Sequence, residues 1–495
     1  MARYFEGPNN DDDGAFEIIH YNKILPENHP ARYIKMFVDN LPIDKFENKY
    51  QVGEGQRGRA PKKIRLMLGV ILYAIYSRIY SARKIDEATY TYADFWLFTH
   101  KQRISHDKIS DFIIVHEKEM KDVFLETILL AEKNELLNFS ALYMDGFQIK
   151  ANANKHKNKN KSELNRKQEK LEKALIEVIA KMGESDKTED TEKEKERLEN
   201  EICKIKNLQL ELNEKIKKRT ENKEEQEAKD LSKKLTINKT DRESELSKMK
   251  DGSYASAYTK INALDSKADI VIGSDVDGRN DEPGKTLDLF RKSQANCKEL
   301  GKFKTVVADS NFNTMGNCVM FEALGVELIS PTKDFENEQR NPKKYENKIK
   351  FEYHPEKNCM ICTEGKELKE GKRFLNAREG RVIMTFWNKA ACASCSRRKE
   401  CTQSAAGFKK LKIDARIESQ QKVLERYKSD KGKVLYKKRQ HTAEVYQADC
   451  KYNGKMTQFL RRGLDKIRVD CLIYDITWNL RRIFNIKAQD MVWVR

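Results

Sequence analysis

Residues 140–151 read SALYMDGFQIKA, and this stretch decides the fold. Apolar and β-forming residues lie on both sides of the Asp145-Gly146 dipeptide, so the stretch predicts two short strands that meet there. Strand patterns return later in the chain, with helical patterns between them. We expect strands at 257–264, 269–276, 304–308 and 326–329, and helices at 287–297 and 314–324. Strands that alternate with helices in this way indicate an α/β sheet.

Three acidic residues stand out by their context. Asp145 ends the first predicted strand, Asp309 follows the apolar run VVA, and Glu444 lies in a basic, helix-rich region. Carboxylates from two strands and a helix could converge on two divalent cations, which would support in-line phosphoryl transfer. Mg²⁺ suits carboxylate oxygens. Taken singly, an Asp at a strand end is more often a turn residue or a cap.

Composition narrows the classes of function. The chain has 495 residues, which suggests roughly two to four domains. It contains 96 Lys and Arg residues and 78 Asp and Glu residues, so its net charge is 96 − 78 = +18. This charge points to a polyanionic partner, most simply nucleic acid. The most apolar stretch, 66–76, is about 11 residues long, whereas a bilayer span needs about 20, so we expect a buried helix and no membrane partner. No secretory signal precedes it, and a cytosolic location with reduced thiols is expected.

The regions outside the sheet are expected to be helical. Residues 20–135 carry helical patterns around a basic glycine-rich loop, GEGQRGRAP, at 53–61. Short helices with basic turns are compatible with a helix-turn-helix, and an ordinary helical bundle explains the pattern equally well. The chain is again helical and basic from about residue 415 to its end.

A charged segment interrupts the sheet pattern after the basic linker 152–161. Apolar residues recur there at spacings of three and four, at Leu164, Leu171, Leu175, Val178 and Met182 and again at Leu198, Ile202, Ile205, Leu212 and Ile216. A turn-like break, GESDKTEDT, separates the two sets at 183–191. We interpret them as an antiparallel pair of charged helices; one long solvated helix is the alternative.

Half of the ten cysteines fall within residues 359–401. Cys359 and Cys362 form one CxxC pair, Cys392 and Cys395 form another, and Cys401 follows. This spacing is typical of a tetrahedral zinc site, and we favour Cys362, Cys392, Cys395 and Cys401 as ligands with Cys359 as a competitor. Reduced cysteines in a loop are the alternative. The other five are expected to be packing residues: Cys203, Cys297, Cys318, Cys450 and Cys471.

With these motifs in view, the chain resembles the DDE transposases of bacterial insertion sequences. The N-terminal resemblance lies in LPENHPARYIKMFVDNLPIDKF, GRAPKKIRLMLGVILYAIY, SARKIDEA and HDKISDF. The catalytic motifs resemble YMDGFQIKANANK, VVADSNFNT, and YKKRQHTAEVYQADCKYNG followed by FLRRGLDKIRVDCLIYDITWNLRRI. The Cys segment is similar to one in a subgroup of these transposases. The order of the motifs along the chain makes the resemblance specific.

The resemblance implies roles for particular residues. The family's catalytic acids, which would bind two Mg²⁺ (or Mn²⁺) ions, correspond to Asp145, Asp309 and Glu444. The accompanying Tyr, Arg and Lys of the family correspond to Tyr436, Arg439 and Lys451. Of these, Arg439 and Lys451 would contact phosphates near the cut. One ion would activate water for strand cleavage, and the freed 3′-OH would then attack target DNA.

The chain departs from the family pattern at three points. Ser310, Asn311 and Phe312 follow the second Asp where a small residue, Gly and Tyr are usual. Val-Tyr-Gln follows Glu444 where Pro, an apolar residue, Phe and Gly are usual, and residues 258–261 read YTKI instead of Tyr-Asn-x-Gln. All three acids remain, so we expect an active enzyme.

The implied fold class is α/β, with an RNase H-like mixed sheet flanked by helices, interrupted by a helical hairpin or coiled-coil insert and a Cys-rich insert, and preceded by an all-α N-terminal domain. The predicted domains are a helical DNA-binding domain at 1–135, a catalytic core at 136–154 and 241–350, the hairpin at 155–240, the Cys-rich insert at 351–410, and the C-terminal helical part of the core at 411–495.

The implied partner is double-stranded DNA, both the terminal inverted repeats and the target, bound by a homodimer or larger assembly at the bacterial nucleoid. The hairpin would bind DNA, pair two protomers or act as a passive spacer. Two rival functions stay open: an RNase H-like nuclease without strand transfer, and an inactive or domesticated DNA-binding protein derived from a transposase.

Overall fold

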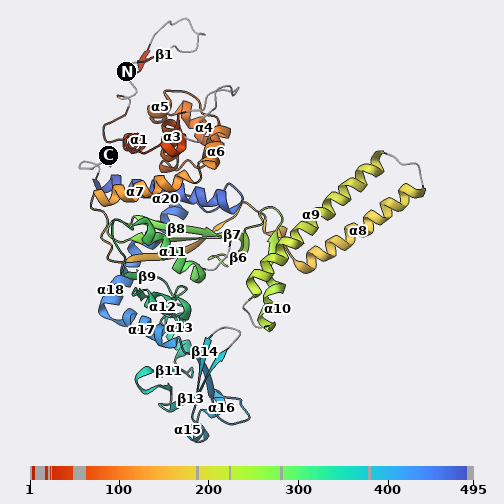
Figure 1. Cartoon of the computed structure of the whole chain (residues 1–495), viewed down its shortest axis with the longest axis vertical. Coiled ribbons are helices and arrows are strands. Elements are labelled where there is room, and N and C mark those ends of the chain that lie inside the picture. Colours follow the sequence, from red (N-terminus) through yellow and green to blue (C-terminus); the bar gives the residue numbers. More distant parts are fainter. Residues whose placement is uncertain are drawn as a thin grey trace.

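The computed structural model describes residues 3–5, 17–19, 23, 25–47, 63–184, 189–221, 225–278, 282–376 and 381–487. Figure 1 shows an elongated body from which one long helical arm projects sideways. N-terminal helices lie at one end of the body, the central sheet lies in the middle, and a second, smaller sheet lies at the other end. The glycine-rich loop expected at 53–61 lies outside the described residues.

A mixed sheet forms the centre of the body. Its strands are β3 (Leu142–Lys150), β6 (Glu245–Lys248), β7 (Tyr254–Asp265), β8 (Val271–Asp277), β9 (Thr305–Val307) and β10 (Glu327–Ile329). The order is β10-β9-β3-β7-β6, with β8 also paired to β7. Strands β10, β9 and β3 run parallel, whereas β7 runs antiparallel to β3, β6 and β8. The expected RNase H-like mixed sheet is confirmed.

The first strand differs from the prediction. Residues 142–150 form one uninterrupted strand instead of two strands that meet at Asp145-Gly146. Each of them pairs in register with β7, with Asp145 opposite Asn262 and Gly146 opposite Ile261. The long partner strand gives the backbone hydrogen bonds along its whole length, so the Asp-Gly pair stays extended and forms no turn. Asp145 therefore lies in mid-strand.

One helix joins the sheet to the N-terminal part of the chain. Helix α20 (Leu464–Lys487) packs on β8 on one side and on α3 (Ile64–Tyr76) and α7 (Glu119–Lys133) on the other. Helix α11 (Glu282–Asn296) also packs on β7 and β8. A single hydrophobic core runs through the N-terminal helices, the sheet and α20. The two parts therefore share one core.

The N-terminal part is helical, as expected. Its elements are the short strands β1 (Arg3–Phe5) and β2 (Glu17–Ile19), and helices α1 (Pro30–Asp39), α2 (Asp44–Glu47), α3, α4 (Ala82–Thr91), α5 (Ala93–Thr99), α6 (His106–Val115) and α7. The apolar stretch forms α3, which is buried over most of its length because α1, α4, α5, α6 and α20 surround it. None of the helices in the described ranges is both long and apolar enough to cross a membrane.

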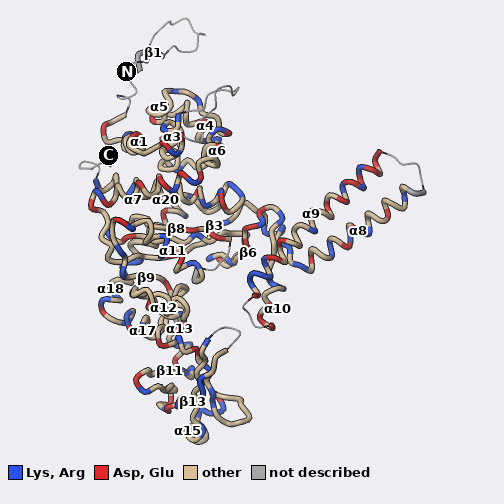
Figure 2. The backbone as a smooth tube through the Cα atoms, viewed as in Figure 1, with Lys and Arg blue, Asp and Glu red and all other residues tan. Residues whose placement is uncertain are grey.

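The arm contains a pair of long helices and not one long helix, so the single-helix alternative is wrong. Its elements are β4 (Asn158–Asn160), α8 (Lys161–Glu184), α9 (Glu189–Thr220), α10 (Glu225–Lys234) and β5 (Thr236–Asn238). Helices α8 and α9 lie side by side and antiparallel (Figure 1), and β4 pairs with β5 where the arm leaves the body. Figure 2 shows Lys and Arg interspersed with Asp and Glu along both helices. The break at 183–191 lies partly outside the described residues.

The second sheet carries the Cys-rich segment. Its strands β11 (Phe351–His354), β12 (Cys359–Cys362), β13 (Glu367–Asn376), β14 (Arg381–Trp387) and β15 (Lys410–Asp414) pair antiparallel in sequence order around a small core of their own. The other helices are α12 (Met315–Ala323), α13 (Lys333–Arg340), α14 (Pro342–Tyr345), α15 (Lys389–Ala393), α16 (Arg398–Cys401), α17 (Ile417–Lys428), α18 (Asp430–Lys438) and α19 (Ala443–Ala448). Of these, α15 and α16 lie in the Cys-rich segment, whereas α12 and α17 pack on β10 and α19 packs on β3 and β7 of the central sheet.

We predict that Leu212→Ala loosens the arm. Leu212 is fully buried where α9 meets α8, so its truncation should cost about 2–5 kcal/mol of local stability. Backbone amides of α8 and α9 should then exchange with deuterium faster, and those of β3 and β7 should not change. The matched control is Leu210→Ala, since Leu210 lies in the same helix but is 63% exposed. Equal exchange in the two variants would contradict the packing.

Candidate active site

The strand register brings the first two acids together. Tyr143 of β3 pairs with Val307 of β9, and the strands are parallel. Asp145 follows Tyr143 by two residues, and Asp309 follows Val307 by two residues. Residues at matching positions of neighbouring parallel strands lie side by side, so the two aspartates are neighbours. Asp145 is buried in the sheet, whereas Asp309 is half-buried just after β9 ends. Ser330 Oγ donates to the Asp309 carbonyl at 2.7 Å and fixes the chain there.

Arg439 connects the third acid to this pair. One guanidinium nitrogen donates to Asp145 Oδ2 at 2.7 Å, and the other donates to Glu444 Oε1 at 3.2 Å. Arg439 lies in a short 3-10 turn, and Glu444 lies in the first turn of α19. Helix α19 packs on β3, where Gln447 Nε2 donates to the Gly146 carbonyl at 3.2 Å. The structure therefore gathers the three predicted acids around one guanidinium.

Burial sets the electrostatics of the acids. It raises the pKa of Asp145 to about 6, while Arg439 lowers the pKa and the neighbouring Asp309 raises it. Burial also raises the pKa of Asp309, again opposed by Arg439. Two carboxylates close together in a poorly hydrated position resist ionisation, and a cation between them relieves that cost.

Tyr436 and Lys451 flank the acids. The guanidinium of Arg439 lies 5.6 Å from the centre of the Tyr436 ring, a distance at which the ring attracts the cation. Lys451 lies in a π-helical turn after α19, with its ammonium group 5.0 Å from the centre of the Phe147 ring. Burial lowers the pKa of Lys451, and Lys250 lowers it further. The two residues expected to contact phosphates therefore lie close to the first acid: Arg439 contacts Asp145 itself, and Lys451 contacts Phe147 of the same strand.

Glu336 of α13 was missed by the sequence reasoning. Its carboxylate accepts from Ser310 Oγ at 2.6 Å and from the Tyr436 hydroxyl at 3.4 Å. Glu336 also raises the pKa of Asp309, as a smaller contribution than burial. The sequence offered one signal, the serine directly after Asp309, because a hydroxyl there can donate to a carboxylate.

A buried ion pair supports the helix that carries Glu444. Lys260 Nζ lies 2.7 Å from Asp475 Oδ1, and both side chains are fully buried. Asp475 also accepts from Ser274 Oγ at 2.6 Å and from the Tyr446 hydroxyl of α19. Lys260 is part of the sequence YTKI at 258–261, which differs from the family pattern. One of the residues that differ from the pattern therefore forms a buried ion pair. The pair joins β7, α20 and α19.

The acids have the ligand chemistry for divalent cations but not yet the spacing. Within the described parts of the chain, no three His, Cys, Asp or Glu residues are placed to hold one metal ion. Carboxylate oxygens are the donors that Mg²⁺ and Mn²⁺ take. Arg439 lies between Asp145 and Glu444, where its guanidinium neutralises their charge. In this arrangement Arg439 occupies one carboxylate oxygen of Asp145 and one of Glu444.

Comparison with protein families gives two matches. Residues 361–484 match the model of the family described as "Transposase DDE domain", and residues 19–114 match that of "Transposase domain (DUF772)". Both are transposase families. The matches support an insertion-sequence DDE transposase, which confirms the resemblance found in the sequence. A search of curated proteins found no match to the chain.

The matched regions contain part of the site. The DDE match includes Arg439, Glu444 and Lys451, whereas Asp145 and Asp309 lie outside both matches. The strand register and the Arg439 contacts are therefore what link these two acids to the matched region.

We predict that Asp145→Asn stabilises the protein above pH 6. The pKa of Asp145 is about 6 when folded and 3.8 in the reference state, so the folded chain binds the proton more tightly. The cost of ionising the buried carboxyl is absent below about pH 4, grows up to pH 6 and is fully present above it. Asn removes this cost, and urea unfolding should show a gain of about 1–3 kcal/mol at pH 8 and little gain at pH 4. The control is Asp288→Asn, on the exposed face of α11, which should not change the free energy of unfolding at either pH. If Asp145→Asn gave the same gain at pH 4 and pH 8, the raised pKa of Asp145 could not be its cause.

We predict that Lys260→Met destabilises the fold strongly. The change leaves Asp475 charged and fully buried, which should cost about 3–5 kcal/mol in urea unfolding. Adding Asp475→Asn removes that charge, keeps one oxygen that can accept from the Tyr446 hydroxyl, and places an amide group that can donate to Ser274 Oγ. The double variant should therefore recover part of the loss. A double variant that is less stable than Lys260→Met would contradict the electrostatic explanation.

Proposed function

We propose that this chain is a DDE-type transposase that cleaves DNA strands and transfers them at the ends of an insertion sequence. The observation that carries the proposal is the arrangement of Asp145, Asp309 and Glu444. A parallel strand register places the two aspartates together, and one arginine contacts the first aspartate and the glutamate. The family matches support DNA as the substrate.

Asp145, Asp309 and Glu444 would hold two Mg²⁺ (or Mn²⁺) ions. When bound, such a pair of ions activates an attacking oxygen and stabilises the leaving oxygen of an in-line phosphoryl transfer. The raised pKa values of the two aspartates fit this role, since a carboxylate pair that resists ionisation gains from a cation. The ions would replace the positive charge that Arg439 supplies in their absence.

Arg439 and Lys451 would then contact DNA. A guanidinium forms a planar fork that fits either a carboxylate or a phosphate, so Arg439 can exchange Asp145 for a phosphate oxygen near the cut. Lys451 would act as a point charge on a neighbouring phosphate. Tyr436 would keep the plane of Arg439 oriented through their ring contact.

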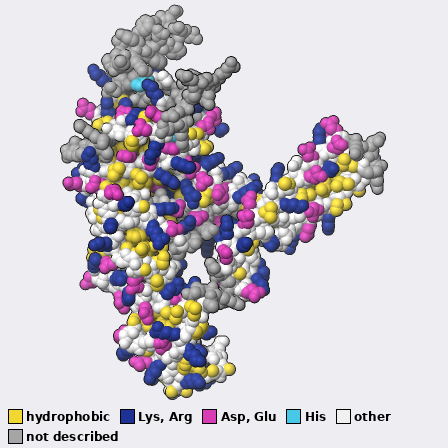
Figure 3. Space-filling view, viewed as in Figure 1, with side chains coloured by type: hydrophobic (Ala, Val, Ile, Leu, Met, Phe, Trp, Pro, Cys, Tyr) yellow, Lys and Arg dark blue, Asp and Glu magenta, His cyan; other side chains and the backbone are white. Residues whose placement is uncertain are grey.

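The DNA path we propose follows a groove between the N-terminal helices and the segment before α20. Its basic lining includes Arg78, Arg83, Lys84 and Lys455. Figure 3 shows Lys and Arg side chains, with Asp and Glu among them, on one face of the molecule near the point where the arm leaves the body. The N-terminal helices would read the terminal inverted repeats, and a homodimer would join two ends in the bacterial cytoplasm, at the nucleoid. The arm would bind DNA, pair two protomers or act as a passive spacer.

We predict divalent-cation-dependent cleavage of a labelled duplex that carries the end of the encoding element. The alanine variants of Asp145, Asp309 and Glu444 should each lose at least about 100-fold in rate, the size expected when one preorganised active-site group is removed. Asp288→Asn is the control and should cleave like the unmodified chain, because Asp288 is exposed on α11 and takes no part in the site.

The products separate the rival functions. Joining of the cleaved end to a supercoiled plasmid is the result the proposal expects. Cleavage without joining would indicate a nuclease, and binding of the element end without cleavage would indicate a DNA-binding protein derived from a transposase. Equal cleavage by the unmodified chain and by Asp145→Ala would overturn the catalytic assignment.

A further inference from the structure

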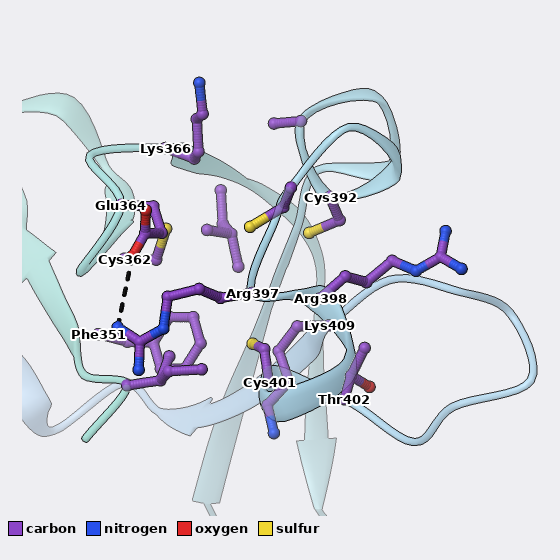
Figure 4. Close-up of a pocket in the computed structure, with 14 residues that line it drawn as sticks. Phe351, Cys362, Glu364, Lys366, Cys392, Arg397, Arg398, Cys401, Thr402 and Lys409 are labelled. Atoms are coloured by element: carbon purple, nitrogen blue, oxygen red, sulfur yellow. Dashed lines mark hydrogen bonds and ion pairs between the residues drawn. The ribbon is translucent and has the colours of Figure 1, made fainter. Parts of the chain in front are cut away.

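Four cysteines from separate elements line one cavity in the second sheet region. Cys362 ends β12, Cys392 lies in α15, Cys395 follows it, and Cys401 ends α16. Figure 4 shows Cys392 and Cys401 on one side of this cavity and Cys362 across from them. The fold therefore brings together residues up to 39 positions apart, since 401 − 362 = 39.

The fold separates the fifth cysteine from the other four. Cys359 and Cys362 occupy the two ends of β12, three positions apart. Side chains an odd number of residues apart on a strand point to opposite faces of the sheet. Cys359 is accordingly buried and does not line the cavity. The sequence left Cys359 as a competitor, and the strand excludes it.

Tight turns present the four sulfurs. Cys395 N–H donates to the Cys392 carbonyl at 3.3 Å, and Cys401 N–H donates to the Arg397 carbonyl at 3.0 Å. On the sheet side, Gly365 N–H donates to the Cys362 carbonyl at 2.8 Å in the turn between β12 and β13. Two short turns, each with a cysteine at or beside its start, form the kind of knuckle that grips a zinc ion in small domains.

Two of these cysteines lie in short helices, and Cys395 lies between them; little else holds these helices. Helices α15 and α16 span 5 and 4 residues and bury no side chain. Helices so short are not stable alone. The small core of the second sheet is made of strand residues and reaches neither helix. Polar contacts do attach them, such as Asn388 Nδ2, which donates to the Glu367 carbonyl at 2.7 Å before α15. A cross-link through the sulfurs would supply the missing stabilisation.

Positive side chains also line the cavity. Arg397, Arg398 and Lys409 line it together with the cysteines. Positive side chains near a thiol stabilise its deprotonated form, which is the form that binds metal.

We infer that Cys362, Cys392, Cys395 and Cys401 bind one structural Zn²⁺ ion that fixes α15 and α16 to the second sheet. Binding releases the thiol protons and forms four Zn–S bonds of about 2.3 Å. The sulfurs surround the cavity without reaching the spacing of a metal site, so binding draws the two short helices toward Cys362. The site lies in the second sheet region, apart from the acidic cluster, and does not depend on the proposed catalysis.

The test is zinc content with a matched set of serine variants of the full chain. Elemental analysis of purified protein should give about one zinc per chain, and Cys392→Ser and Cys401→Ser should fall below about half an ion. Cys359→Ser is the control, because it removes a nearby buried thiol outside the cavity, and should keep its zinc. Less than about half an ion in the unmodified chain, or an equal loss in Cys359→Ser, would overturn the inference.

A second measurement covers the case in which a serine variant does not fold. Chelator treatment of the unmodified chain should expose residues 389–409 to protease, and Zn²⁺ but not Mg²⁺ should reverse this. Co²⁺ added to the chelated protein should give the visible absorption bands of a tetrahedral thiolate site. A disulfide between any two of the four cysteines in freshly purified protein, with no protection by Zn²⁺, would instead show a redox cross-link and contradict the metal site.

Discussion

The buried ion pair between Lys260 and Asp475 is the constraint on which the rest of the structure depends. Each charge lies wholly out of water, and a buried charge without its partner costs several kcal/mol. Strand β7 and helix α20 can therefore pack in only one register, the one in which the two charges meet. Tyr446 and Ser274 donate the remaining hydrogen bonds to Asp475. The N-terminal helices pack on the far side of α20, so their position follows from the same pair.

The candidate site depends on this pair through α19. Tyr446 attaches α19 to Asp475 of α20 through a hydrogen bond. The turn after α19 is attached to α20 through Asp449, whose Oδ2 accepts from the Tyr474 hydroxyl at 2.6 Å and from Arg481 at 3.0 Å. Glu444 stands at one end of this segment and Lys451 at the other. A segment fixed at two points holds both groups against β3, where Asp145 is already fixed by the sheet register.

Much of the fold could be predicted from local patterns. The alternation of strands and helices after residue 257, the buried helix at 64–76 and the two charged helices of the arm all follow from periodicity, which short windows of sequence record. The single strand through Asp145-Gly146 could not be predicted in this way. An Asp-Gly pair favours a turn locally, but the long partner β7 supplies hydrogen bonds that outweigh this preference. Likewise, the contact between Lys260 and Asp475 spans 215 positions, and no local pattern indicates it.

The acidic residues of the site could be predicted from the sequence, but the residues that surround them could not. Asp145, Asp309 and Glu444 came from strand ends and motif order, whereas Arg439 as a bridge between acids and Glu336 as an acceptor for Ser310 needed the fold. The measurement that tests the central claim most directly is a crystal structure of the full chain with Mn²⁺, in which anomalous scattering locates the ions. We expect peaks among the carboxylates of Asp145, Asp309 and Glu444, with Arg439 turned away from Asp145. Saturating Mn²⁺ without a peak there, and with Arg439 still bonded to both Asp145 and Glu444, would contradict it.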